Sequence, residues 1–115
     1  MWYVTAVVNA LMKSSEWPHT VLVITWDEYG GFYDHVAPPS RNGATLGPRV
    51  PALIVSPYAR IGFIDHTPMD FSSILRYVED RFGLAPLTAL DRDAASIAGM
   101  TDSTPHPDPL LISGP

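Results

Sequence analysis

The stretch TVLVITW, residues 20–26, is apolar and β-branched, with no alternation of polar residues. A second apolar run, PALIV, occupies residues 51–55, and its proline stands at the first position, where a strand tolerates it. Runs without alternation are typical of strands covered on both faces, as in a parallel sheet between helices. The two runs therefore predict an α/β fold of short buried strands flanked by helices.

Helical periodicity precedes the first strand. Residues 3–12 place Val4, Val7, Val8 and Leu11 at the spacing of one helix face. Because no capping residue comes before this run, we expect the helix to begin before the sequence does.

A longer helix is predicted over residues 68–82. Thr67 is its expected N-cap, Pro68 takes the first helical position, and Gly83 closes it. Its apolar stripe consists of Phe71, Ile74, Leu75, Val78 and Phe82. Asp91 is the expected cap of a shorter helix over residues 91–98.

Composition limits the function classes. Hydrophobic residues make up 46% of the 115 positions and charged residues 17%, as in one small globular domain. The seven basic residues are scattered and the formal net charge is −5, so no nucleic-acid partner is expected. The absence of cysteine excludes a thiolate zinc site and a cysteine nucleophile. The longest apolar runs are far shorter than the ~20 residues of a transmembrane segment, and the first basic residue, Lys13, comes too late for a signal peptide.

Proline divides the chain. Four of its 12 prolines fall within the last eleven residues. We therefore predict a domain over residues 1–100 and a Pro-rich, extended surface tail over residues 101–115.

The first candidate site is a carboxylate pair. Asp27 and Glu28 directly follow the first strand, at the kind of strand end where functional groups gather in open α/β sheets. Neighbouring strand residues point to opposite faces, so both carboxylates reach one ion only if the backbone turns there, and Gly30 and Gly31 allow a turn nearby. Oxygen ligands without sulfur favour Mg, Ca, Mn or Zn. The alternative is a solvated acidic loop start.

Three other residues invite both functional and structural interpretations. His35 could ligate metal, contact a phosphoryl oxygen or protonate a leaving group, or it could be a loop histidine bonded to a carbonyl. Arg49 could bind phosphate through two parallel hydrogen bonds or brace a loop against a carboxylate. For His66, packing at the start of the helix is favoured over anion binding.

Four segments together resemble the bacterial phosphoesterase family, which contains phosphatidylcholine-type phospholipases C and an acid phosphatase branch. The likeness runs from about residue 3 to residue 94. The segments are TWDEYGGFYDHV (25–36), Pro38-Pro39, GPRVPALIVSPYAR (47–60) and SILRYVEDRFGL (73–84).

The resemblance implies a partial alkaline-phosphatase-like layered fold and metal-assisted hydrolysis of phosphate esters. It matches Asp27 and Glu28 to the family's late pair of metal ligands, for a divalent ion of unknown identity. It matches His35 to a histidine near the phosphoryl group, in a catalytic role.

Two departures accompany the resemblance. The family's early Glu-Asn metal pair and its Ser/Thr nucleophile have no counterpart, so we expect the C-terminal part of an enzyme that acts only with the missing N-terminal part. At residues 70–73, Asp-Phe-Ser-Ser replaces Asp-His-Thr-Ser of the phospholipase branch, which favours the phosphatase branch slightly.

The expected function is therefore phosphate ester hydrolysis, with a phospholipid or a small phosphomonoester as substrate. The resemblance implies a secreted or periplasmic enzyme. The alternative from a different class is a non-catalytic module that uses its acidic loop to bind a divalent ion or a partner.

Overall fold

Two short antiparallel strands lie at the centre of the computed structural model, which describes residues 2–106. β1 (Leu22–Thr25) pairs with β4 (Ala52–Val55), and Leu22 lies opposite Val55. The connection between them carries a small hairpin of β2 (Ser40–Arg41) and β3 (Ala44–Thr45).

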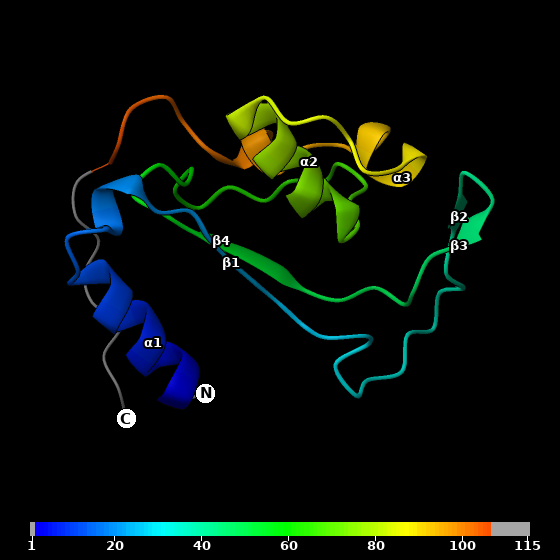
Figure 1. The fold of residues 1–115 in the computed structure, drawn as a ribbon. Helices are drawn as coiled ribbons and strands as arrows, with labels where there is room; N and C mark the ends of the chain where they lie inside the picture. The colour runs from blue at the N-terminus through cyan, green and yellow to red at the C-terminus, as the bar shows by residue number, and fades with distance from the viewer. Residues whose placement is uncertain (1, 107–115) are drawn as a thin grey trace.

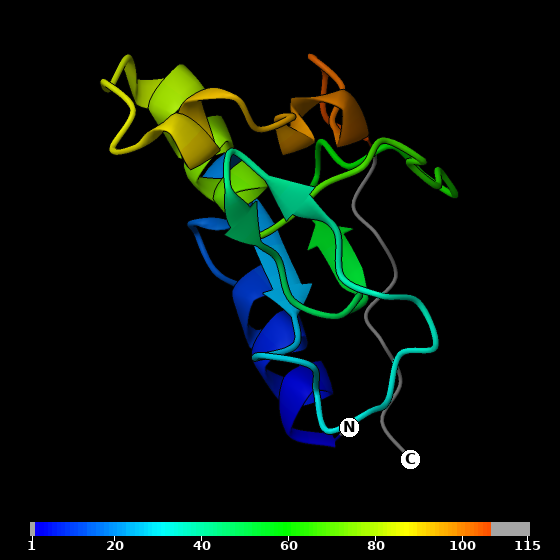
Figure 2. The same ribbon diagram turned by 90° about the vertical axis from the view of Figure 1, so that its right-hand side faces the viewer.

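Helices lie on both sides of the β1–β4 pair (Figures 1 and 2). α1 (Trp2–Met12) and the 3₁₀ helix η1 (Trp17–His19) lie on one side. On the other side lie α2 (Ser72–Phe82), α3 (Ala89–Arg92) and the 3₁₀ helix η2 (Ile97–Met100). This mixture of helices and strands agrees with an α/β fold, whereas the alkaline-phosphatase-like layering stays a prediction.

The prediction of buried strands in a parallel sheet is wrong in two respects. β1 and β4 run antiparallel, and Ala52 and Leu53 of β4 are exposed. The physical reason is that an apolar run indicates a strand but not the direction of its neighbour. In residues 2–106 the pair also lacks further strands that would shield its edges.

The predicted first helix is confirmed as α1. Only Val8 of its apolar positions is fully buried, and Val4 and Val7 are exposed. The buried hydrophobic residues of the described chain are Val8, Trp17 and Ile97. The core is therefore small.

α2 ends where the sequence predicts but begins later. Gly83 adopts a left-handed conformation (φ +64°) and closes the helix, as expected. Thr67 is not the N-cap, because the helix starts at Ser72, whose backbone N–H donates to the Asp70 carboxylate (2.8 Å). Most of the predicted apolar stripe is exposed, and the buried residues of α2 are Ser73 and Glu79.

The predicted helix over residues 91–98 is also corrected. Thr88, not Asp91, caps α3, and its hydroxyl accepts from the Leu90 backbone N–H (3.1 Å). Asp91 takes the third helical position and its carboxylate accepts from the Thr88 backbone N–H (2.8 Å), completing a capping box.

The beginning of the predicted tail follows the loop after β4. The backbone N–H of Asp102 donates to the Tyr58 carbonyl, and that of His106 donates to the Pro57 carbonyl (both 2.7 Å). The remainder of the predicted tail, residues 107–115, lies outside the described residues. No helix in residues 2–106 has the length and apolar character needed to cross a membrane.

Candidate functional site

The carboxylate pair stands at a sharp backbone turn. Asp27 and Glu28 directly follow β1, and both are exposed. Glu28 has a left-handed backbone (φ +49°), and the Gly30 N–H donates to the Asp27 carbonyl (2.8 Å). The turn ends the alternation of side-chain directions that a continuing strand would impose on two neighbouring residues. The predicted turn is therefore confirmed, and metal ligation stays a prediction.

The glycines of this loop are used as the sequence suggests. Gly30 and Gly31 have φ values of +66° and +78°, which non-glycine residues rarely adopt. Gly30 also approaches an aromatic side chain closely, because a Cβ atom at this position would lie 2.6 Å from Cδ1 of Trp26. The turn that follows the carboxylates thus packs directly on Trp26.

The chemistry of this pair fits a hard divalent cation, but its number of donors does not complete a site. Carboxylate oxygens are the ligands that Mg²⁺ and Ca²⁺ prefer, and these ions take six or more ligands. In residues 2–106 no three His, Cys, Asp or Glu side chains form a group that could hold a metal ion. Within residues 2–106, Asp27 and Glu28 therefore fit at most part of a divalent-cation site.

His35 lies on a shallow concave surface beside the carboxylate turn. Its exposed ring packs edge-on against Tyr33, with the ring centroids 5.0 Å apart and an interplanar angle of 85°. The concavity has a volume of about 620 Å³ and is lined by Tyr29, Gly31, Phe32, Tyr33, Asp34, His35, Val36, Ala37, Pro38 and Pro48. Its lining does not include Asp27 or Glu28. The structure thus places His35 and the carboxylate pair in one loop without bringing them together.

Asp34 and Arg49 form a two-pronged ion pair across this loop. Arg49 donates from Nε to Asp34 Oδ2 (3.0 Å) and from Nη2 to Oδ1 (2.8 Å). These hydrogen bonds hold the pKa of the Asp34 carboxyl well below its usual range, so the group stays ionised. Of the two sequence-based interpretations of Arg49, the structure shows the brace.

The position of His66 differs from expectation, and the sequence does not reveal a polar cluster before α2. His66 is exposed and lies six residues before α2, so it does not stand at the helix start. Ser72, for which the sequence gives no site signal, accepts a hydrogen bond from Arg41 Nη2 (2.6 Å) and donates one to the Asp70 carboxylate. No sequence motif identifies Arg41 as the partner of Ser72 and Asp70.

The family model of the phosphoesterase family matches residues 1–85. The matched region contains Asp27, Glu28, His35 and Arg49, and it ends before α3.

Curated relatives agree with this match. The non-hemolytic phospholipase C of Burkholderia pseudomallei is 37% identical over 108 residues, covering 70% of this chain and 15% of that protein. Phospholipase C B of Mycobacterium tuberculosis is 32% identical over 127 residues, covering 85% of this chain and 24% of that protein. Non-specific phospholipase C6 of Arabidopsis thaliana is 35% identical over 115 residues, covering 79% of this chain and 22% of that protein. The likeness is therefore not confined to bacteria.

The chain thus spans about a quarter or less of the length of these relatives. All three carry the name phospholipase C, and membership of an acid phosphatase branch stays a prediction. More than half of the chain fits the family model, and its relatives share about a third of their aligned residues with it. The chain therefore belongs to the phosphoesterase family.

Proposed function

We propose that this chain takes part in the hydrolysis of a phosphate ester, with Asp27 and Glu28 as ligands of a divalent cation. The observation that carries the proposal is the carboxylate pair at the end of β1, held at a turn that frees both side chains from strand alternation. Family membership over residues 1–85, which include this pair, supports it.

In this proposal the protein side chains have separate roles. A bound divalent cation supplies charge stabilisation at the phosphoryl oxygens and at the attacking hydroxyl. Asp27 and Glu28 hold that charge in place, and the exposed ring of His35 donates a proton or a hydrogen bond to an oxygen of the ester. The nucleophile and the other ligands come from residues outside this chain.

For the substrate, the names of the relatives favour a phospholipid. A small phosphomonoester is the second candidate, because residues 70–73 read Asp-Phe-Ser-Ser where the phospholipase branch has Asp-His-Thr-Ser. Export of the protein from the cytoplasm belongs to the same proposal, since it rests on the family resemblance.

Metal binding is tested on the 115-residue chain itself. The backbone amide signals of residues 27–31 are followed by NMR while Mg²⁺, Ca²⁺, Mn²⁺ or Zn²⁺ is added. We expect one or more of these ions to shift the signals at millimolar concentrations, because a partial site binds weakly, and Asp27→Asn or Glu28→Gln to abolish the shift. Glu16→Gln, which changes an exposed carboxylate after α1, is the matched control. Equal shifts in all variants would show that the pair is a solvated loop start.

Catalysis is tested in a chimera. Residues 1–85 replace the matching segment of the Burkholderia pseudomallei phospholipase C, and hydrolysis of phosphatidylcholine and of p-nitrophenyl phosphate is measured. We expect Asp27→Asn and Glu28→Gln to lower both metal content and activity. His35→Ala should lower the rate about 10²–10⁴-fold while metal content persists. A folded chimera that binds metal at the pair but hydrolyses neither ester would favour the non-catalytic binding module.

A further inference from the structure

The carboxylate of Asp34 is almost completely engaged. Its side chain is only 10% exposed, and its two oxygens accept four N–H hydrogen bonds. One comes from the backbone of Val36 (3.0 Å), and three come from Arg49: its backbone N–H (2.9 Å), Nε (3.0 Å) and Nη2 (2.8 Å). Asp34 is therefore an anchor of the loop and has little capacity left for another partner.

The geometry of this contact requires arginine. The planar guanidinium presents two parallel N–H groups to the two carboxylate oxygens, and a lysine ammonium lacks this fork. Arg49 reaches Asp34 across 15 residues of sequence, from the segment that leads into β4. The pair thus ties the aromatic loop to the central strand pair.

His35 stands between the two anchored positions. Asp34 is held by Arg49, and the Val36 N–H is held by Asp34, so the backbone on both sides of His35 is fixed. In residues 2–106 the His35 ring makes an edge-on contact with Tyr33 and no hydrogen bond. The ring is therefore oriented by the shape of the loop, since the neighbouring carboxylate is occupied.

We propose that Arg49 is a positioning residue, which acts through Asp34 to hold the loop that orients His35. The proposal rests on the proposed function in one respect, namely that His35 works at the phosphate ester. It also assigns Arg49 a structural partner in place of a substrate phosphate, because Nε and Nη2 are both directed at Asp34.

The direct test reads the orientation of His35 by NMR in the 115-residue chain. In the parent chain we expect nuclear Overhauser effects between the ring protons of His35 and Tyr33. Arg49→Gln should abolish them and move the His35 ring signals to those of an unstructured peptide, while the signals of His19 and His66 stay in place. Arg49→Lys should behave like Arg49→Gln, because the charge alone does not supply the fork.

Arg92→Gln is the matched control, since Arg92 makes a comparable exposed two-pronged contact with Asp93 (2.9 and 3.1 Å), far along the sequence from this loop. It should leave the His35 signals unchanged. Unchanged His35 signals in Arg49→Gln would overturn the proposal. Loss of the Trp17 and Ile97 core signals in both Arg49 variants would also overturn it, because Arg49 would then stabilise the whole domain.

This test needs neither metal nor turnover, so its result is separate from that of the proposed function. In an active chimera, Arg49→Gln should lower kcat by no more than His35→Ala does and leave metal content unchanged. Combining the two changes should cost little beyond His35→Ala alone, because Arg49 acts through His35. Additive losses would instead assign Arg49 a direct contact with the substrate.

Discussion

Arg41 Nη2 lies 2.7 Å from Asp70 Oδ2, and this ion pair joins the β2–β3 hairpin to the segment that starts α2. The same nitrogen donates to Ser72 Oγ (2.6 Å), and both acidic and basic side chains are largely shielded from solvent. The start of α2 at Ser72 is therefore set by a residue 31 positions earlier in the sequence as well as by local turns.

Arg41→Gln is expected to destabilise the chain by about 1 kcal/mol, because it removes charge-assisted hydrogen bonds that are partly buried. The measurement is the free energy of unfolding in urea. Arg92→Gln, at an exposed ion pair, is the control and should change it little. Equal effects of the two variants would show that the Arg41–Asp70 pair does not secure the hairpin.

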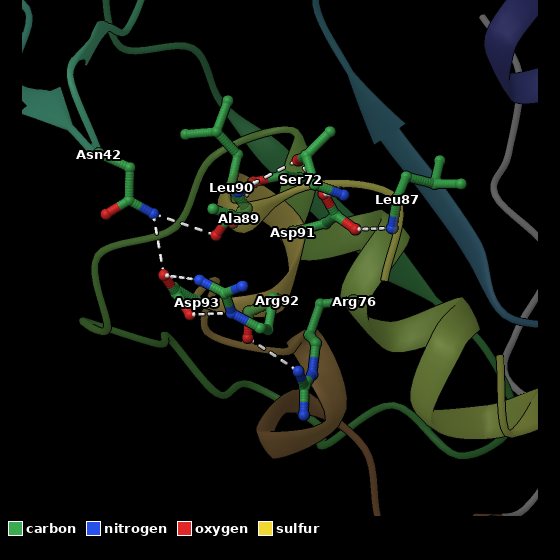
Figure 3. Close-up of polar contacts among 10 residues, drawn as sticks. Asn42, Ser72, Arg76, Leu87, Ala89, Leu90, Asp91, Arg92 and Asp93 are labelled. Atoms are coloured by element: carbon green, nitrogen blue, oxygen red, sulfur yellow. Dashed lines mark hydrogen bonds and ion pairs between the residues drawn. The ribbon is translucent and has the colours of Figure 1, made fainter. Parts of the chain in front are cut away.

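The caps of α2 and α3 give a second prediction. The Thr88 hydroxyl caps α3 by accepting a hydrogen bond from the Leu90 N–H. Figure 3 shows a neighbouring hydrogen bond, which the Leu87 N–H donates to the Asp91 carboxylate. Thr88→Ala should cost about 1 kcal/mol, the usual loss for a cap. Thr67→Ala should cost less, because Thr67 does not cap α2 in spite of the sequence signal. The same urea experiment compares them, and a larger loss for Thr67→Ala would contradict the observed start of α2.

Features that depend on a few neighbouring residues could be predicted from the sequence. Features that depend on contacts between distant parts of the chain could not. Gly83 ends α2 and the glycines after Glu28 form a turn, since a left-handed backbone is a local requirement. The direction of β4 against β1 depends on pairing between runs about 30 residues apart, and an apolar pattern does not encode it.

The same distinction applies to the candidate site. The acidic pair and His35 are visible as a motif in one short segment. The choice of Asp34 as the partner of Arg49 is visible only in the fold, because either phosphate or a carboxylate satisfies a lone arginine equally well. The buried pair of Glu79 and Asp91 was likewise missed, since a polar residue on a helix is usually exposed.

Gly30 and Gly31 give a third prediction. Both have a positive φ, but only Gly30 would place a Cβ against Trp26, and nothing lies within 4 Å of a Cβ at Gly31. Gly31→Ala should cost about 1–2 kcal/mol for the left-handed backbone alone. Gly30→Ala should cost roughly 1–3 kcal/mol more, since the indole must move. Urea unfolding and the Trp26 indole N–H signal measure both effects, and an unmoved indole signal in Gly30→Ala would contradict the close packing.

Two buried carboxyls lie between α2 and α3. Glu79 is 6% exposed, and neither of its carboxyl oxygens has a hydrogen-bond partner in residues 2–106. Asp91 is 1% exposed, and its carboxylate accepts from the Leu87 and Thr88 backbone N–H groups. Burial raises the pKa of Glu79 and the nearby Asp91 carboxylate raises it further, whereas the Thr88 hydroxyl lowers the pKa of Asp91 to about 2.

These opposite shifts predict opposite pH dependences. The folded state binds the Glu79 proton more tightly than the unfolded state, so ionisation of Glu79 reduces stability as pH rises from its ordinary pKa of about 4.3 through its raised value. Ionised Asp91 contributes stability to the folded chain above about pH 4, and this contribution is lost as pH falls toward 2.

Glu79→Gln should therefore raise the urea midpoint at pH 7 and raise it less at pH 4, because the amide resembles the protonated acid. Asp91→Asn should lower the midpoint at pH 7, and Glu16→Gln, at an exposed carboxylate, should change it little at either pH. A loss of stability in Glu79→Gln of the same size at both pH values would mean that Glu79 is ionised and paired in the folded chain.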